Sequence, residues 1–122
     1  MNKSFEAIAR DVEQKAFAVS DYFLPPSVSQ QILADAKEFF AEGEFRKAKI
    51  GKGIEEQRIT EIRSDQIHWL DKNDLTPALQ NYWQQADALR EYISNYFRLT
   101  LPWFESHLAV YPVGSFYKKH LD

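Results

Sequence analysis

The hydrophobic pattern of this chain changes period near residue 103, and this change limits the folds open to it. Before that point, apolar residues recur every three or four positions in several segments, which is typical of helices that bury one face. From Trp103 onward, apolar and polar residues alternate, which is typical of strands. Helices followed by strands predict an α+β fold, with N-terminal helices packed on one face of an antiparallel sheet.

Start and stop signals delimit two of the predicted helices. One is predicted to begin with Ser27 or Ser29 as its N-cap and to end at Gly43. The other has Thr76 in the N-cap position and Pro77 as its first residue, where a missing backbone N–H does no harm. The long apolar stripe of this second helix is interpreted as core rather than as a cofactor site.

Shorter elements complete the predicted fold. Helical spacing predicts a further helix over residues 1–16, and polar composition predicts a loop or loose hairpin over 45–60. Strands are predicted over residues 17–19, 66–70, 106–111 and 116–122, with a turn at 112–115. The pattern stops within a strand. It contains about 20 residues of β region, far fewer than the roughly 70–100 that a jelly roll needs. A truncated chain is therefore expected.

Composition excludes several classes of protein. Apolar residues make up 44% of the 122 residues and aromatics 15%, which is enough for a packed core. The absence of cysteine excludes disulfides and thiolate metal sites, and a net charge of −3 gives no electrostatic footprint for nucleic acid. The start lacks the apolar stretch of a signal peptide, and no run approaches the roughly 20 apolar residues of a membrane span. A soluble, cytoplasmic protein with no nucleic-acid or membrane partner is expected.

Two potential metal ligands lie at the end of the chain. His120 and Asp122 are two positions apart on a predicted strand, so their side chains point to the same face. Such a pair, completed by a second histidine, forms the facial triad of non-haem iron(II) oxygenases. Taken alone, the pair is a weak pattern, since most such pairs are surface residues.

The neighbouring residues give this pair a context. The stretch from Ala109 to Asp122, AVYPVGSFYKKHLD, resembles the metal-binding strand pair of the prolyl 4-hydroxylase family of iron(II)- and 2-oxoglutarate-dependent dioxygenases. Residues 62–69, IRSDQIHW, resemble the strand that precedes the long helix in that family. With the helix between them, these motifs cover about half of the chain. The likeness is strongest to the bacterial relatives of the hypoxia-sensing prolyl hydroxylases.

The resemblance implies a cofactor site. His120 and Asp122 match the first two ligands of Fe(II), and both would be catalytic. Tyr111 matches the tyrosine that hydrogen-bonds 2-oxoglutarate near its metal-chelating end; without the resemblance it could be simple core. Ascorbate is a further candidate cofactor. The second histidine ligand and the basic residue that pairs with the distal carboxylate of 2-oxoglutarate have no counterpart in this sequence.

The resemblance also implies a substrate site. Tyr117 matches an aromatic residue near the substrate entrance, and Arg63 and Asp65 match a pair that holds the peptide substrate or the loop covering it. The substrate would be a prolyl residue of a protein or peptide. Without the resemblance, Arg63 and Asp65 could be a surface ion pair worth about 0–1 kcal/mol.

These expectations define one domain and its alternatives. Residues 1–122 would be the N-terminal part of a single dioxygenase domain, with helical support over 1–100 and the first strands of a truncated jelly-roll core (double-stranded β-helix) over 103–122. His68 and His107 are expected to face solvent or pack on aromatic rings rather than bind metal.

The alternative function is a catalytically inactive fragment or binding module of the same ancestry, with a homodimer or strand-swapped association through the unfinished sheet. A hydrolase using His120 and Asp122 is disfavoured because no nucleophile elbow is present.

Overall fold

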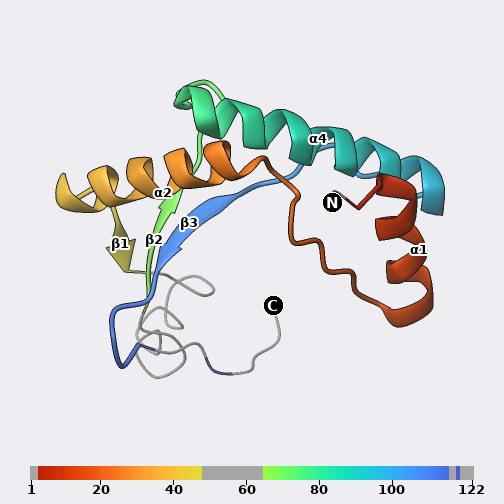
Figure 1. The fold of residues 1–122 in the computed structure, drawn as a ribbon, viewed down its shortest axis with the longest axis horizontal. Helices are drawn as coiled ribbons and strands as arrows, with labels where there is room; N and C mark the ends of the chain where they lie inside the picture. Colours follow the sequence, from red (N-terminus) through yellow and green to blue (C-terminus); the bar gives the residue numbers. More distant parts are fainter. Residues whose placement is uncertain (1–2, 48–64, 116–117, 119–122) are drawn as a thin grey trace. The chain divides into compact units, whose positions relative to one another are not determined.

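The structure, a computed structural model, describes residues 3–47, 65–115 and 118 (Figure 1). It divides into two units, which we call the helical unit (residues 1–35 and 71–105) and the sheet unit (residues 36–70 and 106–122). The elements in the described ranges are α1 (Phe5–Lys15), α2 (Pro26–Ala41), β1 (Arg46–Lys47), β2 (Gln66–Trp69), α4 (Pro77–Phe97) and β3 (His107–Val110).

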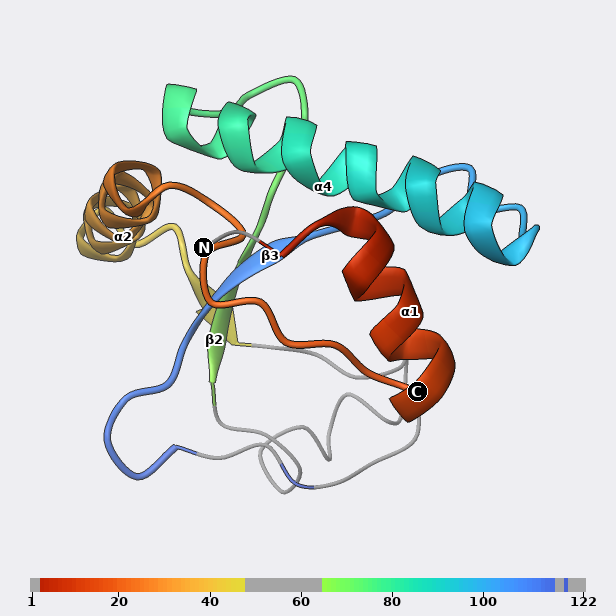
Figure 2. The same cartoon turned by 45° about the vertical axis from the view of Figure 1, so that its right-hand side comes forward.

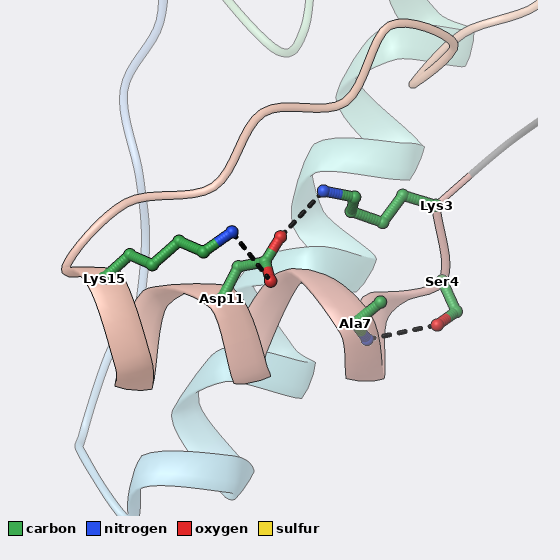
Figure 3. Close-up of polar contacts among 5 residues, drawn as sticks. All are labelled: Lys3, Ser4, Ala7, Asp11 and Lys15. Atoms are coloured by element: carbon green, nitrogen blue, oxygen red, sulfur yellow. Dashed lines mark hydrogen bonds and ion pairs between the residues drawn. The ribbon is translucent and has the colours of Figure 1, made fainter.

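Helix α1 confirms the helix predicted over residues 1–16. Ser4 is its N-cap, and the backbone N–H of Ala7 donates to the Ser4 hydroxyl oxygen over 3.1 Å. The Asp11 carboxylate lies between two ammonium groups, 2.7 Å from Lys3 and 3.9 Å from Lys15 (Figure 3). The hydrogen bond from Lys3 lowers the pKa of Asp11, and the nearby positive charges act in the same direction.

The strand predicted over residues 17–19 is wrong. Helix α1 ends at Lys15, and its C-cap residue Ala16 takes up the left-handed conformation with φ of 71° and donates its N–H to the Val12 carbonyl. Phe17 and Val19 then follow an irregular path with exposed side chains. The described residues of the helical unit include no strand that could pair with this segment, so the alternating pattern alone does not produce one.

Helix α2 begins earlier than predicted. Its first residue is Pro26, so Ser27 and Ser29 lie inside the first turn and neither is the N-cap. The Ser29 hydroxyl instead lies 3.5 Å from the carbonyl oxygen of Pro25. The reason is the fixed φ of proline, which suits the first position of a helix and needs no backbone N–H there.

The end of α2 confirms Gly43 as a terminator. The Glu44 N–H donates to the Phe39 carbonyl over 2.9 Å, and the Gly43 N–H donates to the Phe40 carbonyl over 3.1 Å. This pair of hydrogen bonds is a Schellman motif. It requires a left-handed residue, and Gly43 supplies it with φ of 75°.

Helix α4 begins as predicted, with Thr76 as N-cap and Pro77 in the first position. The Leu79 N–H donates to the Thr76 hydroxyl oxygen over 3.3 Å, and that hydroxyl donates to the Asp35 carboxylate over 2.7 Å. Asp35 is buried and also accepts a hydrogen bond from the Gln31 amide over 3.0 Å. One carboxylate therefore ties the first part of α2 to the start of α4.

The core of the helical unit lies where α1 runs alongside α4 (Figure 2). The Phe5 and Tyr92 rings meet at 5.9 Å between centroids, and the Trp83 and Phe104 rings at 4.5 Å. Its buried apolar residues are Ile8, Ala9, Ala78 and Leu79. Leu79 is the most buried residue of the α4 stripe, and most other members of that stripe stay partly exposed.

The sheet unit contains an antiparallel sheet in the order β1-β2-β3 (Figure 1). Its register places Ile67 opposite both Arg46 and Ala109. This confirms the strands predicted at 66–70 and 106–111 and the α+β class. The described residues form this partial sheet, so the jelly-roll core is not shown. The strand predicted over 116–122, Lys118 apart, lies outside the described residues, as does most of the loop predicted over 45–60.

Candidate functional site

Most residues of the predicted site fall outside the part of the chain that the structure describes. These are the metal ligands His120 and Asp122 and the substrate-site residues Tyr117 and Arg63. Their roles remain predictions. The described members of the predicted site are Tyr111 and Asp65, and both belong to the sheet unit.

Tyr111 and Asp65 lie at the same end of the β2–β3 strand pair. Gln66 at the start of β2 is opposite Val110 at the end of β3. Asp65 directly precedes the first of these residues, and Tyr111 directly follows the second, so the two predicted site residues border the same end of the ladder. Their exposure differs, because Tyr111 is 49% exposed whereas Asp65 is 1% exposed and already interacts within the protein.

A tight turn follows Tyr111, as the sequence predicts. The Ser115 N–H donates to the Pro112 carbonyl over 2.8 Å, which closes a four-residue turn. Gly114, in the third position, has φ of 89°, a conformation that favours glycine. The turn begins one residue after Tyr111, so the backbone is well defined beside this side chain.

His68 is held by aromatic rings and a backbone carbonyl. Its ring lies 4.9 Å from that of Phe39 and 5.8 Å from that of Phe45 between centroids. Its Nδ1 lies 3.1 Å from the Glu44 carbonyl oxygen, which fixes the tautomer with the N–H on Nδ1 as the donor. This contact confirms the expectation that His68 packs on aromatic residues.

His107 also packs on an aromatic ring, edge-on to Trp69 at 4.8 Å between centroids. The register places His107 opposite Trp69 and His68 opposite Leu108. Since neighbouring positions on a strand point to opposite faces, the two histidines lie on different faces of the sheet and cannot share one ion. Among the described residues, no group of three histidine, cysteine, aspartate or glutamate side chains could hold a metal.

The helical unit contains a groove that sequence reasoning did not anticipate. Its volume is 630 Å³ and its walls are mostly apolar. Residues from α1, α4 and the segments around 18–23 and 101–104 line it, among them Ile8, Ala18, Leu89 and Ile93. The sequence signal for it is the apolar stripe of α4, which periodicity predicts as core. That interpretation holds for Leu79 but not for the later turns, whose apolar side chains form the groove wall.

Comparison with known proteins gives a clear structural likeness. No protein-family model and no curated protein matches the chain. A crystal structure of a Pseudomonas putida prolyl-4-hydroxylase matches with a TM-score of 0.86 and 32% sequence identity. The match covers 97% of this chain and 60% of that chain. None of the helices in the described ranges is long and apolar enough to cross a membrane. In fold and in sequence, the chain is similar to a prolyl-4-hydroxylase over almost its whole length.

Proposed function

We propose that this chain is the N-terminal part of an iron(II)- and 2-oxoglutarate-dependent dioxygenase domain that hydroxylates prolyl residues of a protein. The observation that carries the proposal is the match to the Pseudomonas putida prolyl-4-hydroxylase at 32% identity and a TM-score of 0.86. It is supported by the His-x-Asp pattern of His120 and Asp122 within residues that resemble the metal-binding strands of that family.

The donor chemistry of the chain fits part of an iron site. An imidazole nitrogen from His120 and a carboxylate oxygen from Asp122 are donors that Fe(II) takes in facial sites. His68 and His107 pack on aromatic rings on different faces of the sheet, so the two could not both join such a site. When bound, iron and 2-oxoglutarate supply the oxygen activation that hydroxylation requires.

Tyr111 would contribute to co-substrate binding. Its side chain is 49% exposed and therefore open to a ligand, and the adjoining turn at Pro112 limits the freedom of its backbone. The phenol O–H would donate a hydrogen bond to a carboxylate oxygen of 2-oxoglutarate. A hydrogen bond to a charged group contributes about 1.5–3 kcal/mol, which corresponds to roughly tenfold or more in affinity.

The substrate site would involve Arg63, Asp65 and Tyr117, on the strength of the family pattern. Asp65 is almost fully buried at the end of the β2–β3 pair that Tyr111 also borders. A carboxylate in that buried position would orient neighbouring polar side chains or backbone groups and would not contact the peptide substrate directly. The substrate would be a protein chain that presents a proline.

Titration of 2-oxoglutarate into the chain, with and without saturating Mn(II) as an oxygen-stable substitute for iron, tests this function. We expect measurable binding only with the metal present. Tyr111→Phe should weaken that binding about tenfold or more. The matched control is Tyr22→Phe, which changes a similarly exposed tyrosine of the helical unit and should have no effect. Metal-independent binding, or equal affinity in both variants, would contradict the proposal.

The second candidate function is a binding module of the same ancestry that does not catalyse. The groove of the helical unit favours it, because an apolar groove of 630 Å³ is suited to holding another group. If this candidate is correct, the chain binds neither Mn(II) nor 2-oxoglutarate in that experiment.

A further inference from the structure

A row of exposed side chains runs along β3 of the sheet unit and ends at Tyr111. His107, Ala109 and Tyr111 are exposed. Leu108 and Val110, which lie between them, are half-buried. Because neighbouring positions on a strand point to opposite faces, the three exposed side chains share one face of the sheet. The predicted co-substrate residue Tyr111 and the histidine His107 are therefore the two ends of one open row.

The two described histidines of the sheet unit differ in what holds them. His68, on the opposite face, has its ring 4.9 Å from that of Phe39 and its Nδ1 bound to the Glu44 carbonyl oxygen. His107 instead meets the ring of Trp69, which lies opposite it in the register, at 4.8 Å between centroids and 74° between ring planes. Trp69 is itself 51% exposed. This contact orients the His107 ring and leaves its nitrogens accessible to a ligand on the open face.

The spacing of the row suits a short dicarboxylate. At about 3.3 Å per residue, the Cα atoms of His107 and Tyr111 are about 13 Å apart along the strand. A hydrogen bond at each end of a ligand takes up about 2.8 Å, and the carbon chain of 2-oxoglutarate, at about 1.5 Å per bond, adds roughly 5–6 Å. Ala109, between the two larger side chains, leaves room above the strand. A molecule of 2-oxoglutarate lying along β3 can therefore reach from Tyr111 to His107.

The chemistry of the imidazole suits the far end of such a ligand. A carboxylate only accepts hydrogen bonds, and an imidazole ring carries at least one N–H donor in either protonation state. Hydrogen bonds to an ionised acceptor are shorter and stronger than those between neutral groups. Since Tyr111 would meet the carboxylate at the metal-chelating end, the carboxylate left for His107 is the distal one.

We propose that His107 donates a hydrogen bond to the distal carboxylate of 2-oxoglutarate and that Trp69 is a positioning residue for the His107 ring. This inference rests on the proposed function and deepens it, because it assigns a residue that selects the co-substrate. The pair makes the site prefer a 2-oxo acid with a second carboxylate over one with an uncharged tail.

The test compares two ligands by titration calorimetry on the chain with saturating Mn(II). One is 2-oxoglutarate. The other is 2-oxopentanoate, which has the same carbon chain and the same metal-chelating end but no distal carboxylate. His107→Ala should weaken the binding of 2-oxoglutarate about tenfold or more, because a hydrogen bond to a charged group is lost. The same variant should bind 2-oxopentanoate as the unaltered chain does.

Three further variants separate a direct contact from a structural role. His107→Gln keeps an N–H donor and should restore part of the preference for 2-oxoglutarate. Trp69→Ala should lower that preference in the unaltered chain but have no further effect in the His107→Ala background, where no ring is left to position. The matched control is His68→Gln, on the opposite face, which should leave the affinity for both ligands unchanged. Circular dichroism checks that each variant is folded.

An unchanged affinity of His107→Ala for 2-oxoglutarate, or an equal loss for both ligands, would overturn the assignment of His107, since a merely structural role affects both ligands alike. Metal-dependent binding of 2-oxoglutarate would persist in that case, so the proposed function would stand. Absence of metal-dependent binding in the unaltered chain would instead overturn the proposed function and this inference together. The two failures are therefore distinguishable.

Discussion

The helical unit and the sheet unit are stabilised in different ways. In the helical unit, the ends of α1 and α4 are fixed by nearby side chains, Ser4 and Thr76, and Asp35 joins α2 to α4. Much of the apolar face of α4 nevertheless remains open as a groove. In the sheet unit, the short strands depend on aromatic packing around Phe45 and His68. The ends of α1 and α4 are thus set by signals within a few residues, whereas the sheet brings together side chains distant in sequence.

The largest expected effect is in the sheet unit, from Phe45→Ala. Phe45 is 7% exposed and packs against Phe40 and His68. Loss of a buried phenylalanine side chain typically costs about 3–5 kcal/mol in the free energy of unfolding. The control Phe17→Ala removes an exposed ring of the helical unit and should cost about 0.5 kcal/mol or less. Urea denaturation measures the loss in free energy of unfolding for both variants. Equal losses would refute the contrast between the two units.

A smaller effect is expected from Asp35→Ala in the helical unit. The substitution removes the acceptor for the Thr76 hydroxyl and the Gln31 amide, and should lower the free energy of unfolding by about 1–3 kcal/mol. Thr76 would keep its capping bond to α4, so helix content by circular dichroism should change little. Asp21→Ala, at an exposed position, is the control. A cost no greater than that of the control would mean that the buried carboxylate does not join the helices.

The smallest effect is a pH dependence at α1. The hydrogen bond from Lys3 lowers the pKa of Asp11 below its ordinary value of 3.8. A carboxyl group whose pKa is lower in the folded chain stabilises the fold above its unfolded pKa, and this contribution is lost as pH falls through the folded pKa. The unaltered chain should therefore lose slightly more stability than Asp11→Asn between about pH 5 and pH 2. Thermal melts across this range measure the difference, and parallel curves would count against the ion pair.

The same contrast explains which parts of the fold could be predicted. Thr76 and Gly43 act through hydrogen bonds within a few residues, so their roles can be inferred from spacing alone. Ser27 and Ser29 also fit the pattern of a cap, but Pro26 begins the helix ahead of them. Residues 17–19 alternate like a strand without a partner strand to complete them. A strand depends on its neighbours, and their positions are not encoded in the strand itself.

The candidate site shows a related limit. Family patterns single out Tyr111 and Asp65, and the register of β2 and β3 places both at one end of the strand pair. The sequence does not indicate that Asp65 is buried while Tyr111 is half exposed, because exposure depends on the side chains packed around each residue. The groove was missed for the same reason. Periodicity identifies the apolar face of α4 but not whether this chain covers it.

Titration calorimetry with Mn(II) tests the central claim, that His120 and Asp122 are metal ligands, most directly. The unaltered chain should bind Mn(II) weakly, because it offers two of the three protein donors of a facial site. His120→Ala should abolish binding, whereas the matched control His107→Ala, which removes a ring packed on Trp69, should leave it unchanged. Binding that survives His120→Ala, or that is lost in His107→Ala, would contradict the account, as would submicromolar affinity in the monomeric chain.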